Sequence, residues 1–275
     1  MAALLRPTTS TYVKAHDTKT MDTPDEEDHT FCGIMFDIVA KRGMPVETLI
    51  VSSLWVRGHL GPLTVWSTPG GFGGKEEDAA AWTRHYEKTR PPSPVDFVEL
   101  RLDPPVLVAP GDRRGIYVHS ARADDLALVY DDAHEELGRP EPQDAFVAVK
   151  PGLAHLSPTP FSHVGAWWGA WRGPRAFVGR LGLGVRYKLW NPPVRALFPR
   201  PFKAVVRTLL LANTRRRTPW GRLHPEIVLY VLNMCRHDWF DRPKRTPEKR
   251  RRETLREPGR NPLRLCRLEK WEEGD

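Results

Sequence analysis

Cysteine is scarce in this chain of 275 residues, which contains only Cys32, Cys235 and Cys266. Their odd number and wide spacing exclude a disulfide framework and indicate a reducing compartment. No apolar run approaches the roughly 18 residues that span a bilayer, and the N-terminus lacks the apolar core of a secretory signal. We therefore expect a cytoplasmic or nuclear protein without a transmembrane segment. The first sixteen residues, which contain no acid, leave an organelle transit peptide open.

Recognisable catalytic and metal-binding motifs are also missing. The sequence contains no His-Glu-x-x-His, Gly-x-Ser-x-Gly or paired Cys-x-x-Cys motif. The segment Gly70-Gly-Phe-Gly-Gly74-Lys75 is followed by Glu76 and Glu77, where a phosphate loop needs Ser/Thr and a helix, so it reads as a hairpin loop. Asp124-Asp125 and Asp131-Asp132 read as solvated turns rather than calcium ligands. We expect a protein that is not an enzyme and that has no catalytic residues, metal or cofactor.

Acidic residues are absent from the middle of the chain. Residues 1–144 contain 15 Lys/Arg and 24 Asp/Glu, whereas residues 145–225 contain 14 Lys/Arg and no Asp or Glu. A stretch with so uniform a charge projects positive potential and attracts an acidic partner. That partner could be a protein, a nucleic acid or an anionic lipid.

The hydrophobic pattern predicts strands up to about Trp190. Ten short strand candidates, bounded by Gly and Pro, occupy residues 31–189, and alternation is clearest in 98–102 and 185–189. This spacing is typical of a sandwich or barrel. We predict a mainly β protein: a flexible leader at 1–29 and an antiparallel, jelly-roll-like β-sandwich at 30–190.

Beyond Pro193 the period changes to that of helices. Apolar residues at 202, 205, 206, 209 and 210 predict one amphipathic helix, and a second begins at Pro225. We expect a helical hairpin at 191–240 and a basic, partly disordered tail at 241–275. The candidate partner-binding stripe of the hairpin is formed by Leu223, Pro225, Ile227, Val228, Val231 and Leu232.

The segment 31–190 resembles a β-sandwich domain of unassigned function found in many algal proteins. The motifs that carry the resemblance are Cys32-Gly-Ile-Met-Phe-Asp-Ile38, the glycine-rich step at 70–74, Ala81-Trp-Thr83, Ala109-Pro-Gly111 before 115–118, and the closing segments 174–175 and 184–187. The resemblance implies a fold but no activity.

The run from Leu223 to Leu232 is similar to the opening helix of F-box domains, and the pair of helices resembles a SOCS box. Such helices dock onto an adaptor of a cullin-type ubiquitin ligase and leave a neighbouring domain to select the target. His224 replaces the F-box proline, and the basic sequence after Phe240 departs from the second half of an F-box. The alternative is a hairpin that packs on its own sandwich.

Three tryptophans within five residues form the most unusual local feature. Trp167, Trp168 and Trp171, followed by Arg172, could stack on a ligand or plug one end of the sandwich. Two clusters form a candidate basic patch: Arg215, Arg216 and Arg217, and Lys249, Arg250, Arg251 and Arg252.

The leading hypothesis is a non-catalytic protein-binding module, with a ligase-adaptor role implied by the resemblance of its helices. Two alternatives stay open: a basic nucleic-acid-binding protein that uses the arginine clusters, and a carbohydrate-binding sandwich that uses the tryptophans.

Overall fold

The computed structural model describes residues 14–133, 141–165, 169–215, 217–235, 237, 239 and 240. It is mainly β, with 48% of the described residues in strands and 17% in helices. The described residues divide into two compact units, one comprising 1–198 with 229–233 and the other comprising the remainder. None of the described helices is long and apolar enough to cross a membrane.

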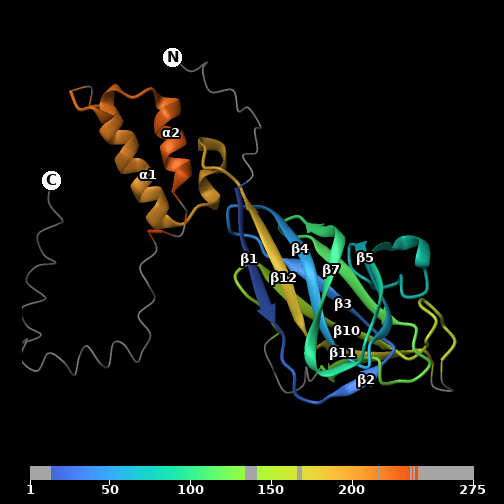
Figure 1. The fold of residues 1–275 in the computed structure, drawn as a ribbon. Helices are drawn as coiled ribbons and strands as arrows, with labels where there is room; N and C mark the ends of the chain where they lie inside the picture. Colours follow the sequence, from blue (N-terminus) through green and yellow to red (C-terminus); the bar gives the residue numbers. More distant parts are fainter. Residues whose placement is uncertain are drawn as a thin grey trace, which may run out of the picture. The chain divides into compact units, whose positions relative to one another are not determined.

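The strands form two antiparallel sheets, as the sequence predicted (Figure 1). The four-stranded sheet has the order β1 (Lys14–Asp22), β12 (Arg180–Tyr187), β4 (Val46–Gly58) and β7 (Ser93–Val108). The eight-stranded sheet has the order β2 (His29–Phe31), β9 (Leu128–Asp132), β11 (Trp171–Phe177), β10 (Val147–His155), β3 (Gly33–Ala40), β8 (Arg113–Ser120), β5 (Gly61–Pro69) and β6 (Thr83–Arg90).

One large apolar core draws side chains from both sheets. Ile34, Phe36 and Ile38 enter it from β3, and Leu49, Val51 and Leu54 enter it from β4. Successive residues of a strand point to opposite faces, so β3 turns Met35 away from this core. Met35 is nevertheless fully buried, in a second cluster. The eight-stranded sheet therefore packs side chains on both of its faces.

The N-terminal segment differs from the flexible leader expected at 1–29. Residues 14–22 form β1, which pairs with β12 from Lys14↔Tyr187 to Asp22↔Arg180. His29 begins β2, which pairs with β9. Residues 1–13 lie outside the described part of the chain.

Two neighbouring strand predictions merge into one strand. The ten strand candidates include 97–102 and 106–108 as two separate strands, with Asp103-Pro-Pro105 between them, but both segments lie in β7. The pairing of β7 with β4 instead shifts register between Val51 and Ser53, so a bulge takes the place of a turn.

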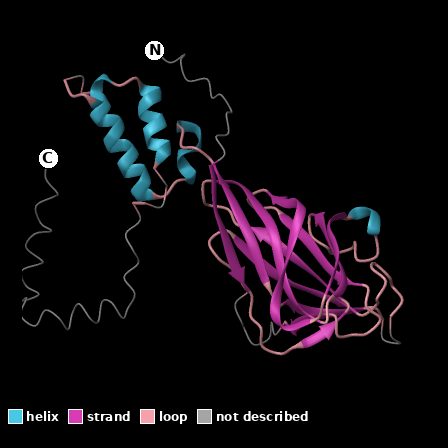
Figure 2. Ribbon diagram, in the orientation of Figure 1, coloured by secondary structure: helices cyan, strands magenta, loops and turns pink. Residues whose placement is uncertain are grey.

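Among the described residues, the helices lie in the C-terminal part of the chain, apart from one short 3₁₀ turn, η1 (Ala79–Ala81) (Figure 2). They comprise the 3₁₀ turns η3 (Pro192–Leu197) and η4 (Trp220–Arg222), and the α-helices α1 (Arg200–Asn213) and α2 (Pro225–Met234). The amide of Asn213 donates to the carbonyls of Trp220 and Leu223, which ties the end of α1 to the segment before α2. The predicted basic tail, 241–275, falls outside the described residues.

Candidate functional site

An aromatic layer covers the face of the eight-stranded sheet that is turned away from the main core. Tyr117 on β8 lies at its centre, with ring centroids 5.3 Å from Trp66 and 5.0 Å from Phe161. Trp82 and Met35 are buried beside it. A sheet face that is exposed to solvent normally carries polar side chains. This face instead carries a second layer of apolar, buried side chains.

Two buried histidines join this layer. The Tyr117 hydroxyl donates to Nδ1 of His155 at 2.6 Å, and Nε2–H of His155 donates to the Ser162 carbonyl at 3.0 Å. His119 donates from Nε2 to the Ser157 carbonyl at 2.9 Å. Burial lowers the pKa of each histidine to about 4, and burial also raises the pKa of Tyr117 well above its usual value. Both imidazoles are therefore neutral at pH 7, and their hydrogen bonds fix their orientation.

Trp171, at the start of β11, stacks on His155 with ring centroids 3.9 Å apart and an interplanar angle of 14°. The stacked histidine holds one face of the indole in place. Trp171 also borders an open pocket of about 580 Å³, which is lined by Gly74, Glu76, Glu77, Asp78, Leu153 and Trp171. A rigid aromatic side chain beside a concave surface is a common element of binding sites.

The loop that joins β5 to β6 also lines the pocket. The buried carboxylate of Asp37 accepts a hydrogen bond from Phe72 N–H at 3.0 Å and pairs with Arg113 at 3.4 Å. The Lys75 ammonium donates to the carbonyls of Pro69 and Gly71, and Trp82 Nε1–H donates to the Lys75 carbonyl at 2.9 Å. These contacts hold the loop in one shape, and three consecutive acidic residues of the loop, Glu76, Glu77 and Asp78, line the pocket.

This loop is the glycine-rich segment that the sequence analysis interpreted as a hairpin loop, and the antiparallel pairing of β5 with β6 agrees with that interpretation. Lys75 points its ammonium at loop carbonyls. The side chains that line the pocket from this loop are carboxylates, which repel phosphate. The loop therefore offers a site for cationic or hydroxyl-bearing groups.

The predicted tryptophan–arginine set is placed only in part. Trp171 lines the pocket, and Arg172 is half-buried next to it in β11. Trp167 and Trp168 lie outside the described residues. The acidic wall, Glu76 to Asp78, was missed by sequence reasoning, because these residues are about 95 positions from Trp171 and only the strand order brings them together.

The predicted helical stripe does not form a single exposed surface. Val228 and Leu232 are fully buried, Val231 and Leu223 are half-buried, and Pro225 and Ile227 are exposed. Two other apolar residues of α2 are exposed like Ile227: Tyr230 is 65% exposed and Met234 is 55% exposed. These three residues follow helical spacing on α2, so the exposed apolar stripe differs from the predicted one.

Of the seven residues in the candidate basic patch, the structure describes two. Arg215 and Arg217 are exposed after the end of α1. Arg216, Lys249, Arg250, Arg251 and Arg252 lie outside the described residues.

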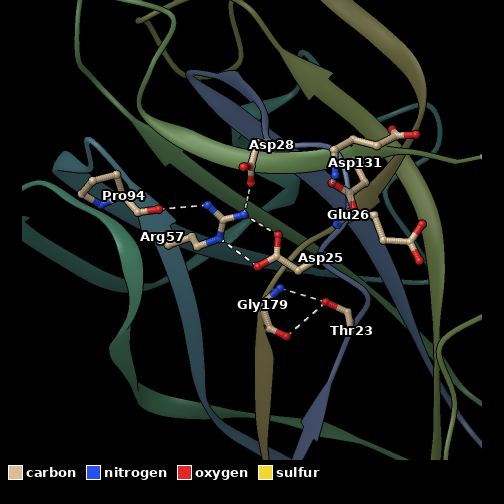
Figure 3. Close-up of polar contacts among 9 residues, drawn as sticks. Thr23, Asp25, Glu26, Asp28, Arg57, Pro94, Asp131 and Gly179 are labelled. Atoms are coloured by element: carbon tan, nitrogen blue, oxygen red, sulfur yellow. Dashed lines mark hydrogen bonds and ion pairs between the residues drawn. The ribbon is translucent and has the colours of Figure 1, made fainter.

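A network of charged groups anchors the segment between β1 and β2 (Figure 3). The guanidinium of Arg57 is buried, pairs with Asp25 and Asp28, and donates to the Pro94 carbonyl at 2.9 Å. The Asp25 hydrogen bond is the main reason that the pKa of Arg57 is raised. Asp131 accepts from the backbone N–H groups of Glu26 and Glu27 at 2.8 and 2.9 Å. The segment that sequence analysis assigned to a flexible leader is thus fixed by specific contacts.

Replacing Arg57 with Ala is expected to lower the free energy of unfolding by about 2 kcal/mol. Removing one partner of a buried ion pair costs more than this, but Asp28 is largely exposed and regains water. Urea unfolding at neutral pH measures the change. Arg101→Ala, which removes an exposed arginine paired with Glu99, is the control and should change stability by less than about 0.5 kcal/mol.

The side chains of Glu27, His29 and Asp132 meet at the adjoining sheet edge, with one potential ligand atom from each lying within 4.8 Å of the others. Asp132 already pairs with Arg175 at 3.1 Å, and its N–H donates to Glu27 at 2.9 Å. These contacts explain the cluster without a cation, and we assign no metal to it.

A serine–histidine pair lies inside the first unit. Nε2 of His85 is 2.8 Å from Ser67 Oγ, and its Nδ1–H donates to the Pro104 carbonyl at 2.6 Å. This arrangement would allow His85 to accept the Ser67 proton, as in nucleophilic catalysis. Ser67 and His85 are only 4% and 8% exposed, however, and Pro104 belongs to the other sheet. The pair therefore links the two sheets and does not face a substrate-accessible surface.

The comparisons with known proteins give no relative: no family model matches the chain, and no curated protein or solved structure matches it significantly. The similarities to the algal sandwich domain and to the F-box or SOCS-box helices stay predictions from the sequence.

Proposed function

We propose that the chain is a non-catalytic protein-binding module, in which a jelly-roll-like sandwich binds a segment of another protein at the Trp171 pocket. The observation that carries this proposal is the construction of the pocket. Its aromatic wall is stacked on the neutral His155, and its acidic wall is held by Asp37, Lys75 and Trp82. A preorganised pocket binds a ligand at a low cost in conformational entropy.

The pocket offers side chains suited to recognition. Trp171 is placed next to three carboxylates, and tryptophan is enriched at the energetic centres of protein interfaces. The pocket is open and shallow, which suits an exposed side chain of an extended segment better than a small molecule that must be enclosed.

Replacing Trp171 with Ala is expected to abolish capture of the bound protein from cells that produce this chain. The measurement is crosslinking followed by purification and quantitative mass spectrometry, with thermal unfolding to confirm that the variant is folded. Trp55→Ala removes a half-buried tryptophan from the other sheet and is the matched control. Partners that depend on Trp171 but not on Trp55 support the proposal, whereas an identical partner set for both variants refutes it.

Carbohydrate binding is the second candidate, because Trp171 beside carboxylates could also stack on a sugar ring and accept hydrogen bonds from its hydroxyls. A glycan array with hits that disappear in Trp171→Ala would favour it over protein binding.

The ligase-adaptor role stays a prediction of the sequence. It assigned the docking stripe to residues that include Val228 and Leu232, which are buried. Pro225 and Ile227 are the members of that stripe that are exposed, and Ile227 is 49% exposed.

A further inference from the structure

The charge of the Trp171 pocket identifies the kind of side chain that it can accept. Glu76, Glu77 and Asp78 are consecutive and all line the pocket. Among the described residues, none of the three forms an ion pair within 4 Å. The nearest lysine in sequence, Lys75, is engaged by the carbonyls of Pro69 and Gly71. Of the described residues that line the pocket, three are acidic and none is basic.

Trp171 supplies the same pocket with an aromatic surface that also favours a cation. One face of the Trp171 indole is covered by His155, which is neutral because its pKa lies near 4. A protonated His155 would itself be a cation stacked on the indole and would repel a second cation. The neutral imidazole does neither. The remaining indole surface can contact a positively charged group, which is attracted by about 0.5–2 kcal/mol depending on its desolvation.

We propose that this pocket binds a cationic side chain of a basic peptide segment, and arginine in preference to lysine. The inference rests on the proposed function and specifies its ligand. A guanidinium is planar, so it can lie against the Trp171 indole while its N–H groups donate to the carboxylates of the β5–β6 loop. A lysine ammonium can reach the same carboxylates, but it cannot stack as a plane.

The shape of the pocket agrees with a side chain that arrives on a peptide. Its volume of about 580 Å³ exceeds that of one arginine side chain and leaves room for adjoining main chain. Leu153 on β10 adds an apolar surface to the lining, against which the methylene groups of arginine can pack.

The test measures binding of fluorescent hexa-arginine, hexalysine and hexaglutamine peptides to the full chain by anisotropy. We expect hexa-arginine to bind more tightly than hexalysine, hexaglutamine to give no binding, and the affinity to fall as salt is raised. The pocket variant Glu76→Gln/Glu77→Gln/Asp78→Asn should weaken hexa-arginine binding by about tenfold or more. Trp171→Leu should weaken it by about fivefold and should reduce the preference for arginine over lysine.

A charge-matched control separates the pocket from the acidic surface in general. Asp96→Asn/Asp112→Asn/Asp125→Asn removes the same charge from exposed positions that do not line the pocket. It should change the affinity by less than about twofold. Equal weakening by the two triple variants, or tight binding of hexaglutamine, overturns the cation proposal.

The two proposals fail in different ways. If cellular partners depend on Trp171 but survive neutralisation of the three carboxylates, the protein-binding function stands and the cationic ligand is wrong. If glycans but no peptide bind in a Trp171-dependent manner, the proposed function is itself wrong.

Discussion

Lowering the pH from 7 to 5 is expected to remove about 4 kcal/mol from the free energy of unfolding, through His119 and His155 together. The pKa of each histidine is about 4 in the folded protein and about 6.5 in the unfolded chain. Above pH 6.5 neither state is protonated, and the stability is fully present. Between pH 6.5 and 4 only the unfolded state takes up protons, so stability falls by about 2 kcal/mol per histidine at pH 5.

Urea unfolding followed by tryptophan fluorescence at pH 7, 6 and 5 measures this loss. His155→Gln keeps a donor and an acceptor but cannot be protonated, so it should reduce the loss by about half. His163→Gln changes an exposed histidine and should leave the pH dependence as it was. The buried carboxyl of Asp37 acts in the opposite sense because burial raises its pKa. A stability that stays constant from pH 7 to 5 would show that these histidines are not buried as described.

Gly152→Ala is expected to lower the free energy of unfolding by about 3 kcal/mol or more, which corresponds to a fall of about 10 °C in the melting temperature. A Cβ added to Gly152 would lie 1.7 Å from the Met35 carbonyl oxygen and 2.6 Å from the Met35 carbonyl carbon. Both atoms belong to the backbone of the neighbouring strand β3. The contact cannot be relieved by a side-chain rotation, so β10 and β3 must separate.

Gly184→Ala is the matched control for this substitution. It is also a strand glycine, but an added Cβ would lie 3.6 Å from its nearest neighbour, Ile50 Cβ, at ordinary contact distance. We expect its melting temperature to be unchanged or slightly raised, because alanine restricts the unfolded chain. Calorimetry or circular dichroism measures both variants, and equal melting temperatures for the two would contradict the steric argument.

The sequence predicted most strands from β-branched and aromatic runs bounded by Gly and Pro, and the pattern was clearest where the two faces of a strand have different environments. In β12 and in residues 98–102 of β7, apolar residues alternate with polar ones because one face joins the core. Three strands were missed. β1 contains Lys14-Ala-His-Asp-Thr-Lys-Thr-Met-Asp22 and has almost no apolar alternation, β2 has only three residues, and β11 is interrupted by Gly173-Pro174.

Only part of the candidate site, Trp171, was predicted from the sequence. Trp171 stood out locally because three tryptophans lie close together in the sequence. In the sequence, the acidic residues of the β5–β6 loop indicated only that this loop does not bind phosphate. Their presence in one pocket with Trp171 depends on the order of six strands from β11 to β6, which no local pattern encodes. The buried histidines of the aromatic layer are far apart in the sequence, so no local pattern indicated that they lie in the same layer.

The pairing of β1 with β12 has a consequence for biosynthesis. These strands lie side by side although more than 150 residues separate them along the chain, and β12 lies between β1 and β4 (Figure 1). A ribosome therefore must release residue 187 before the four-stranded sheet can close. Until then β1 has no partner in that sheet, and the backbone N–H and C=O groups along the edge of β4 that pairs with β12 are unpaired. Nascent chains stalled before β12 should consequently bind chaperones, and chains stalled well beyond it should resist proteolysis.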